Sequence, residues 1–256
     1  MKMRDSRKNR SYFDRWIEHE RASIQRKESR IAGDELPRKG RVLAASRLFD
    51  SVLGVVVMRY SRGDDIESIK GEVRSLLPVR EKMTKLCDLL ETGEGSYRFQ
   101  FEDIRQDHFV QWLWWLAFAL SLDMGREYIQ RSLKLLRNAG KDELFDAIAV
   151  ALGDAGRPVS TEVLYRQYLP LMEAIASPSG RPGLVKEFLD GWYAGSRNVY
   201  WHGNHRDDDS GYMGYWAFEA ALVVMLFDID DSSFRDHEYY PADLVAHYRR
   251  RAGDRT

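Results

Sequence analysis

The chain of 256 residues is 44% hydrophobic and 31% charged, with a formal net charge of −1, a composition typical of a soluble globular protein. A chain of this length can bury enough apolar surface to fold without a metal or a disulfide. Its single cysteine, Cys87, excludes an intrachain disulfide and favours a reducing compartment. The first 16 residues include basic side chains but lack the apolar stretch of a secretory signal, so we expect a cytoplasmic protein.

Apolar residues recur at helical spacing through the first third of the chain and predict three helices. These helices are expected at about 12–31, 42–63 and 65–90. The first is amphipathic and the second is apolar on most sides, as expected of a central helix. The third is expected to bend or break at Pro78, because proline lacks the backbone N–H that a helix interior needs.

The remainder of the chain also shows helical patterns. Residues 97–101 alternate like a strand, but one isolated strand cannot form a sheet, so we expect a loop or the start of a helix there. The longest apolar stretch, 109–122, is shorter than the roughly 20 residues of a membrane span and predicts a buried core helix. Further helices are expected near 103–122, 126–137, 142–152, 161–176, 183–200, 211–228 and 241–250. The predicted fold is therefore all-α, a bundle of about nine to eleven helices in two closely packed halves with no significant β-sheet.

Charge is distributed unevenly between the two ends of the chain. Residues 1–47 contain 14 Lys and Arg against 7 Asp and Glu, whereas residues 199–248 contain 2 against 10. The turn before Arg126 separates these regions and suggests a basic N-terminal helical domain at 1–124 and an acidic C-terminal helical domain at 125–256. The alternative is that the two halves pack as one continuous helical body.

A dense group of polar and aromatic residues, YWHGNHRDDDSGYMGYW, occupies 200–216. His202 and His205 have the spacing of metal ligands, and with Asp209 they suggest one alternative function, that of a metal-dependent hydrolase. No further His or Glu follows at ligand spacing, and Asp209 or Ser210 also suits the cap of a helix expected near Gly211. We therefore predict that the protein binds no metal and no cofactor.

Large aromatic residues beside acids are typical of protein-binding surfaces. Tyr200, Trp201 and Tyr212 lie in or next to the expected loop, where we expect them to be exposed, whereas Trp192 and Trp216 are expected in the core. A solvated acidic face is the alternative explanation of the nearby carboxylates. The basic N-terminal helix gives a further alternative, nucleic-acid binding, but acids alternate with its Arg and Lys residues, which favours an ion-paired solvent-exposed face.

Two stretches resemble a known family. The stretches WYAGSRNVYWHGNH at 192–205 and GYWAFEAALVVMLFDIDDSSFRDHEYYPADLV at 214–245 resemble the C-terminal domain of the PoNe immunity proteins (PoNi). The aromatic pairs at 192–193 and 215–216, the I-D-D-S-S motif and the Y-Y-P motif occur in the same order and spacing. The N-terminal half, with G-D-D-I-E-S-I-K at 63–70, is similar to the companion N-terminal domain of that family.

The resemblance implies an all-helical immunity protein, encoded beside a toxin with a PoNe DNase domain of the PD-(D/E)xK type, which it binds and inactivates in the cytoplasm. The sequence has no nucleotide-binding loop, serine-hydrolase elbow or kinase signature, so we expect no enzyme. We also expect no nucleic-acid or membrane partner. The residues that we predict to contact the toxin are Asp207, Asp208, Asp209, Asp230, Asp231, Tyr200, Trp201 and Tyr212.

Overall fold

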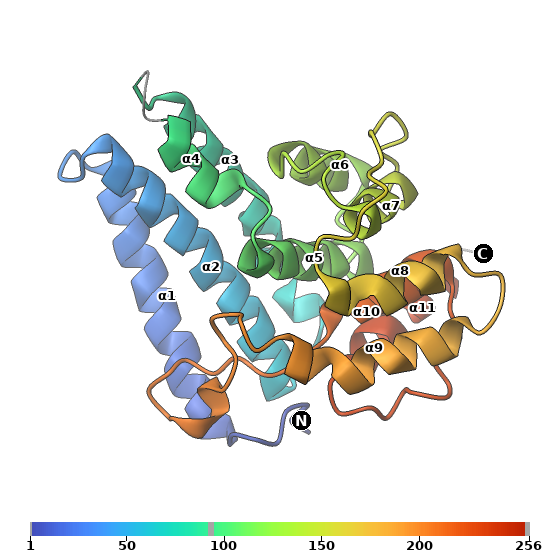
Figure 1. Ribbon diagram of the computed structural model, residues 1–256. Helices are drawn as coiled ribbons and strands as arrows, with labels where there is room; N and C mark the ends of the chain where they lie inside the picture. Colours follow the sequence, from blue (N-terminus) through green and yellow to red (C-terminus); the bar gives the residue numbers. More distant parts are fainter. Residues whose placement is uncertain (1, 92–94, 254–256) are drawn as a thin grey trace. The chain divides into compact units, whose positions relative to one another are not determined.

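The computed structural model describes residues 2–91 and 95–253, and within these ranges it contains α-helices, short 3-10 turns and no strand (Figure 1). The α-helices are α1 Arg10–Ala32, α2 Arg38–Arg62, α3 Lys70–Asp88, α4 Gly95–Glu102, α5 Gln106–Ser121, α6 Arg126–Leu135, α7 Glu143–Ala151, α8 Leu169–Ala176, α9 Arg181–Gly195, α10 Phe218–Phe227 and α11 Ala242–Gly253. The predicted all-α fold is confirmed.

The chain forms two compact units. Unit 1 comprises residues 1–103 together with 203–214, and unit 2 comprises 104–202 together with 215–256. Residues 104–124, which lie on the N-terminal side of the predicted boundary, group with unit 2. The division into family domains at 124/125 stays a prediction.

Helix α2 is the centre of unit 1, with α1 packed on one side and α3 on another. Residues 51–58 of α2 are all buried, as its apolar pattern predicts. Asn9 caps the start of α1, where its side chain accepts a hydrogen bond from the backbone N–H of Tyr12 at 2.9 Å. Helix α2 ends at Gly63 in the left-handed conformation, whose N–H returns to the carbonyl oxygens of Arg59 and Tyr60.

Two local predictions for unit 1, a bend or break at Pro78 and a loop or helix start at 97–101, are tested by the structure, and the break at Pro78 is wrong. Helix α3 continues through Pro78, because that residue is exposed and water can satisfy the carbonyl that loses its N–H partner. Residues 97–101 lie inside helix α4, Gly95–Glu102, so the alternative of a helix start holds and the loop does not. There Arg98 forms an i,i+4 ion pair with Glu102, and the rings of Tyr97 and Phe101 are 5.2 Å apart. Cys87 is buried in this region, which raises the pKa of its thiol to about 11.

Helix α10 is the centre of unit 2, where it packs against α5, α7, α8, α9 and α11. All of its residues from Phe218 to Met225 are buried. Helix α5 is likewise buried along 109–119, so the prediction of a core helix there is confirmed. Helix α10 begins at Phe218 rather than near Gly211, and Ser210 caps no helix. Within the described ranges, no helix combines the length and apolarity that a membrane crossing requires.

The positive φ of Gly63 leads to a stability prediction. A Cβ at this position would lie 2.2 Å from the carbonyl oxygen of Lys2, and φ is +90°. Replacing Gly63 by Ala should therefore lower the free energy of unfolding by about 2 kcal/mol or more, measured as a lower urea midpoint. Gly71→Ala is the matched control, since Gly71 lies in helix α3 and a Cβ there meets nothing within 4 Å. Equal urea midpoints for the two variants would contradict the requirement for glycine at the left-handed position 63.

Candidate functional site

A buried carboxylate organises the aromatic residues of unit 2. Glu219, at the start of α10, is 0% exposed. Its two oxygens accept hydrogen bonds from the indole N–H groups of Trp114 at 2.8 Å and Trp192 at 2.6 Å. Burial raises the pKa of Glu219 to about 7, although the two indole donors act in the opposite direction. Helices α5, α9 and α10 therefore meet at one ionisable group.

The aromatic residues that carry the family resemblance pack around this carboxylate. Trp201 is only 4% exposed and stacks between Trp192, at a ring distance of 5.1 Å, and Trp114, at 5.8 Å. The expectation that Trp201 would be exposed is therefore wrong. Tyr239 also lies against Trp192, with ring centroids 5.1 Å apart. These aromatic residues of the motif form a core around Glu219.

Asp231 has the same kind of role in the loop that follows α10. Its side chain is 2% exposed and accepts hydrogen bonds from Arg235 at 2.5 Å, Arg249 at 2.6 Å and Tyr240 at 3.1 Å. Burial alone would raise the pKa of Asp231, but the two guanidinium groups bring it below its ordinary value. The negative charge of Asp231 is thus paired inside unit 2 and does not contribute to an exposed acidic surface, contrary to our expectation.

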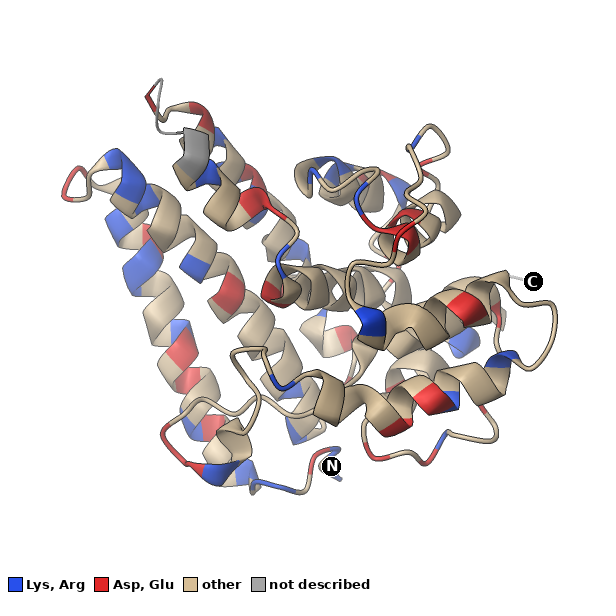
Figure 2. Cartoon of the chain, viewed as in Figure 1, with Lys and Arg blue, Asp and Glu red and all other residues tan. Residues whose placement is uncertain are grey.

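The remaining acids of this loop face solvent. We call residues 228–238 the acidic loop (Figure 2). Its exposed acids are Asp228, Asp230, Asp236 and Glu238. Asp230 accepts hydrogen bonds from the backbone and hydroxyl of Ser232, which fixes the turn and lowers the pKa of Asp230. The one Arg of the loop, Arg235, is committed to Asp231. Negative charge therefore prevails on this surface of unit 2.

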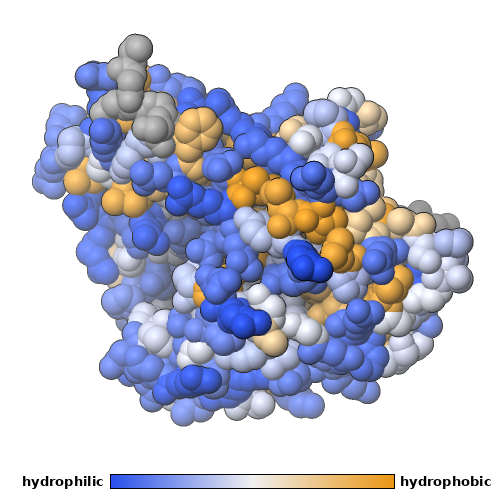
Figure 3. Space-filling view, in the orientation of Figure 1, coloured by the Kyte–Doolittle hydropathy of each residue, from blue (hydrophilic) through white to orange (hydrophobic). Residues whose placement is uncertain are grey.

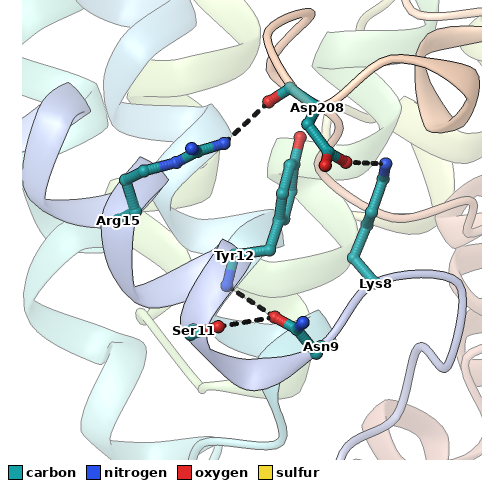
Figure 4. Close-up of a pocket in the computed structure, with 6 residues that line it drawn as sticks. All are labelled: Lys8, Asn9, Ser11, Tyr12, Arg15 and Asp208. Carbon is teal, nitrogen blue, oxygen red and sulfur yellow. Dashed lines mark hydrogen bonds and ion pairs between the residues drawn. The ribbon is translucent and has the colours of Figure 1, made fainter.

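The second group of predicted acids lies on unit 1, in the segment 203–214. Asp208 forms an ion pair with Lys8, and its backbone carbonyl accepts hydrogen bonds from Arg15 at 2.9 Å and from the indole of Trp16 at 3.0 Å. Figure 4 shows Lys8 and Arg15 on either side of Asp208, at an open pocket beside the first turn of α1. The Lys8 ammonium lowers the pKa of Asp208.

The other acids of this segment are exposed but lie beside positive charges. The carboxylate of Asp209 is 4.0 Å from the guanidinium of Arg15, and Asp207 accepts the backbone N–H of Asp209 at 3.0 Å. The acidic excess that the sequence shows near 207–209 is therefore largely compensated by cations from the start of α1. Net negative charge is stronger in the acidic loop of unit 2.

Tyr212 anchors this segment to unit 1. It is 1% exposed, so the expectation of an exposed side chain is wrong here too. Its hydroxyl donates to the buried carboxylate of Asp5 at 2.6 Å, and its backbone N–H donates to the hydroxyl of Tyr12 at 2.6 Å. Of the three predicted aromatic contacts, Tyr200 alone is exposed, at 49%.

The alternative of a metal-dependent hydrolase has no support in the described part of the chain. No group of three or more His, Cys, Asp or Glu residues is arranged there to hold a metal ion. His202 stacks on Tyr193 in unit 2, with ring centroids 4.3 Å apart. His205 belongs to unit 1, where its ring lies 6.3 Å from that of Tyr212. Both histidines are accounted for by aromatic packing.

Sequence reasoning missed a set of exposed apolar side chains in unit 2. Val159, Leu164 and Leu169 are 56%, 42% and 39% exposed. The sequence predicts one helix at 161–176, but the chain is irregular up to Tyr165 and α8 begins only at Leu169. The signal that could have revealed it is the alternation of the β-branched residues Val159, Thr161 and Val163, which favours extended chain over helix.

Comparison with known proteins adds the family. Residues 140–244 match the family model described as PoNe immunity proteins (PoNi), C-terminal. The match covers less than half of the chain, and over these residues the protein is similar to a class of immunity proteins. The particular family is that of the PoNe immunity proteins, and the resemblance to their C-terminal domain is confirmed over the matched residues. The similarity of the N-terminal half to the companion domain stays a prediction.

A solved structure shares the fold. The crystal structure of protein PA2201 from Pseudomonas aeruginosa is similar with a TM-score of 0.72 at 16% identity, over 98% of this chain and 92% of that one. At this identity the likeness concerns the fold alone. No curated protein matched the sequence.

Glu219 leads to a pH prediction. Its folded-state pKa is about 7 against an ordinary value of 4.5, so the folded protein keeps a proton that the unfolded chain releases between these values. The free energy of unfolding should therefore fall as pH rises from 5 to 7, by up to about 3 kcal/mol from this group, and then level off. Urea denaturation of wild type and Glu219→Gln across this range isolates the contribution. An unchanged pH slope in the variant would show that Glu219 titrates normally.

Proposed function

We propose that this chain binds a cognate PoNe-type DNase toxin and inactivates it, so that the cell producing both is protected. The observation that carries the proposal is the family match over residues 140–244. Such a protein acts by binding, in the cytoplasm where the toxin would reach DNA, and it needs no catalytic residue, metal or cofactor. Its partner is the nuclease domain of the toxin.

The acidic loop supplies the electrostatic part of this proposal. A nuclease presents positive charge to phosphates, so a negatively charged protein surface accelerates encounter with it. Asp230 and its neighbours Asp228 and Asp236 are exposed on unit 2, within the matched residues. Rim charges of this kind chiefly change association rates and their salt dependence.

The other predicted contact residues fall into two groups. Asp207, Asp208 and Asp209 remain proposed contacts, although Lys8 and Arg15 compensate much of their charge. Tyr200 is exposed and suits a direct aromatic contact. Trp201, Tyr212 and Asp231 are buried, and in this proposal they support the surface from beneath. This division gives the buried residues a structural role and the exposed ones a binding role.

The proposal predicts stoichiometric protection of DNA. The nuclease domain encoded beside this gene should fail to degrade plasmid DNA when this protein is present in equal molar amount, and the two should co-elute in size-exclusion chromatography. An unrelated DNase, unaffected by this protein, is the specificity control. Complete degradation together with separate elution would reject the proposed function.

The electrostatic part predicts a change in association rate. Replacing both Asp230 and Asp236 by Lys should slow association with the nuclease domain about tenfold at low salt, with a smaller difference at high salt. The matched control is Glu18→Lys with Glu28→Lys on α1, which changes the net charge equally at exposed sites of unit 1. Stopped-flow fluorescence gives the rates. Equal slowing by the two double variants would show that net charge matters and the acidic loop does not.

A further inference from the structure

Two buried carboxylates hold an irregular segment of unit 2 against the start of α7. Asp142 and Asp146 are both 0% exposed. Asp142 caps α7 by accepting the backbone N–H of Phe145 at 2.8 Å, and its second oxygen accepts the backbone N–H of Leu164, also at 2.8 Å. One side chain therefore both starts a helix and fixes a distant part of the chain.

Asp146 fixes the other end of the same segment. It accepts hydrogen bonds from the guanidinium of Arg157 at 2.5 Å and from the backbone N–H of Ser160 at 2.9 Å. Between these anchors, the carbonyl of Glu162 accepts the backbone N–H of Glu143 at 2.8 Å. We call residues 158–164 the apolar loop. The loop backbone forms hydrogen bonds at residues 160, 162 and 164 with Asp146, Glu143 and Asp142 at the start of α7. The loop is therefore rigid although it has no regular secondary structure.

This rigid loop presents apolar side chains to solvent. Val159 is 56% exposed and Leu164 is 42% exposed, and Leu169 at the start of α8 adds a third apolar side chain, 39% exposed. Figure 3 shows hydrophobic atoms gathered over the start of α8 and the segment that precedes it. Exposed apolar groups that cluster on one surface mark interaction sites more often than scattered ones do.

The apolar loop and the exposed Tyr200 meet the same end of α5. The hydroxyl of Tyr165, directly after the loop, donates to the carbonyl of Ile104 at 2.9 Å. The backbone N–H of Tyr200 donates to Asp107 at 3.2 Å, and the side chain of Gln111 donates to the Tyr200 hydroxyl at 3.4 Å. Tyr165, the residue that follows the apolar loop, and Tyr200, which the proposed function places in contact with the toxin, are therefore both held near the start of α5.

The charges of the loop indicate a protein partner. Its sequence, PVSTEVL, contains no Lys or Arg, and its one charged side chain, Glu162, is exposed and negative. Phosphate-rich nucleic acid and anionic lipid surfaces require clustered positive charge, whereas the one exposed cation between the loop and Leu169, Arg166, is offset by Glu162. A folded domain with a positively charged surface, such as a nuclease, matches both the apolar side chains and the negative charge of Glu162.

We propose that the apolar loop, with Leu169 and Tyr200, is the apolar contact surface through which this protein retains the nuclease domain of its toxin. The inference rests on the proposed function and assigns the slow dissociation step to named residues. A loop already held by Asp142 and Asp146 loses little conformational entropy on binding, and apolar anchors in such a setting lengthen the lifetime of a complex.

The test compares dissociation rates. Val159→Ser combined with Leu164→Ser should dissociate from a catalytically inactive form of the adjacent nuclease domain at least tenfold faster than wild type, as measured by surface plasmon resonance. The salt dependence of association should not change, which separates this surface from the acidic loop. The control is Leu89→Ser, an exposed leucine of unit 1 that is 62% exposed and lies outside the matched residues. Thermal unfolding confirms that the variants are folded.

The outcomes separate this inference from the proposed function. If wild type binds the nuclease and the double variant dissociates at the wild-type rate, the apolar loop is not the contact surface, although the immunity function stands. If wild type does not bind at all, both proposals fail. If wild type forms a dimer that the double variant cannot form, the apolar loop binds a second copy of this chain and the inference is overturned.

Discussion

Unit 2 depends on burying carboxylates, each of which must find strong donors or else destabilise the fold. Glu219 accepts hydrogen bonds from two indoles, and Asp231 accepts them from two guanidinium groups and a phenol. Asp142 and Asp146 accept hydrogen bonds from backbone N–H groups of loop residues. In three of these four cases the donors lie in irregular segments or at their edges. The irregular parts of unit 2 therefore acquire defined conformations from buried charge, and these rigid segments carry the surfaces that we propose for binding.

The two proposed surfaces of unit 2 divide the work of binding between charge and apolar contact. The acidic loop places exposed carboxylates around a buried Asp231, whereas the apolar loop places Val159 and Leu164 above the buried Asp142 and Asp146. Long-range attraction governs how often two proteins meet, and desolvated apolar contacts govern how long they stay together. Under the proposed function, in which this protein restrains a nuclease, both contributions are useful.

Most of the helices could be predicted from the sequence, because apolar periodicity reports which face of a helix is buried. The exceptions have physical reasons. Residues 211–217 read as helix because they are apolar, yet they belong to irregular chain in which Tyr212 is fixed by Asp5. The exposure of Trp201 and Asp231 was also predicted wrongly, because burial of a polar or aromatic side chain depends on partners distant in sequence. The stack of Trp201 between Trp114 and Trp192, and the pairing of Asp231 with Arg249, come from helices that sequence spacing does not bring together.

The segment 203–214 belongs to unit 1, although the chain on both sides of it belongs to unit 2. During synthesis the first 103 residues leave the ribosome with Asp5 and Lys8 still lacking the partners that Tyr212 and Asp208 provide. Unit 1 therefore reaches its final set of contacts only after most of unit 2 has been made. The same arrangement restricts recombination between related genes: an exchange of the C-terminal half also exchanges a part of unit 1, so new binding surfaces must be inherited with a segment that still fits α1.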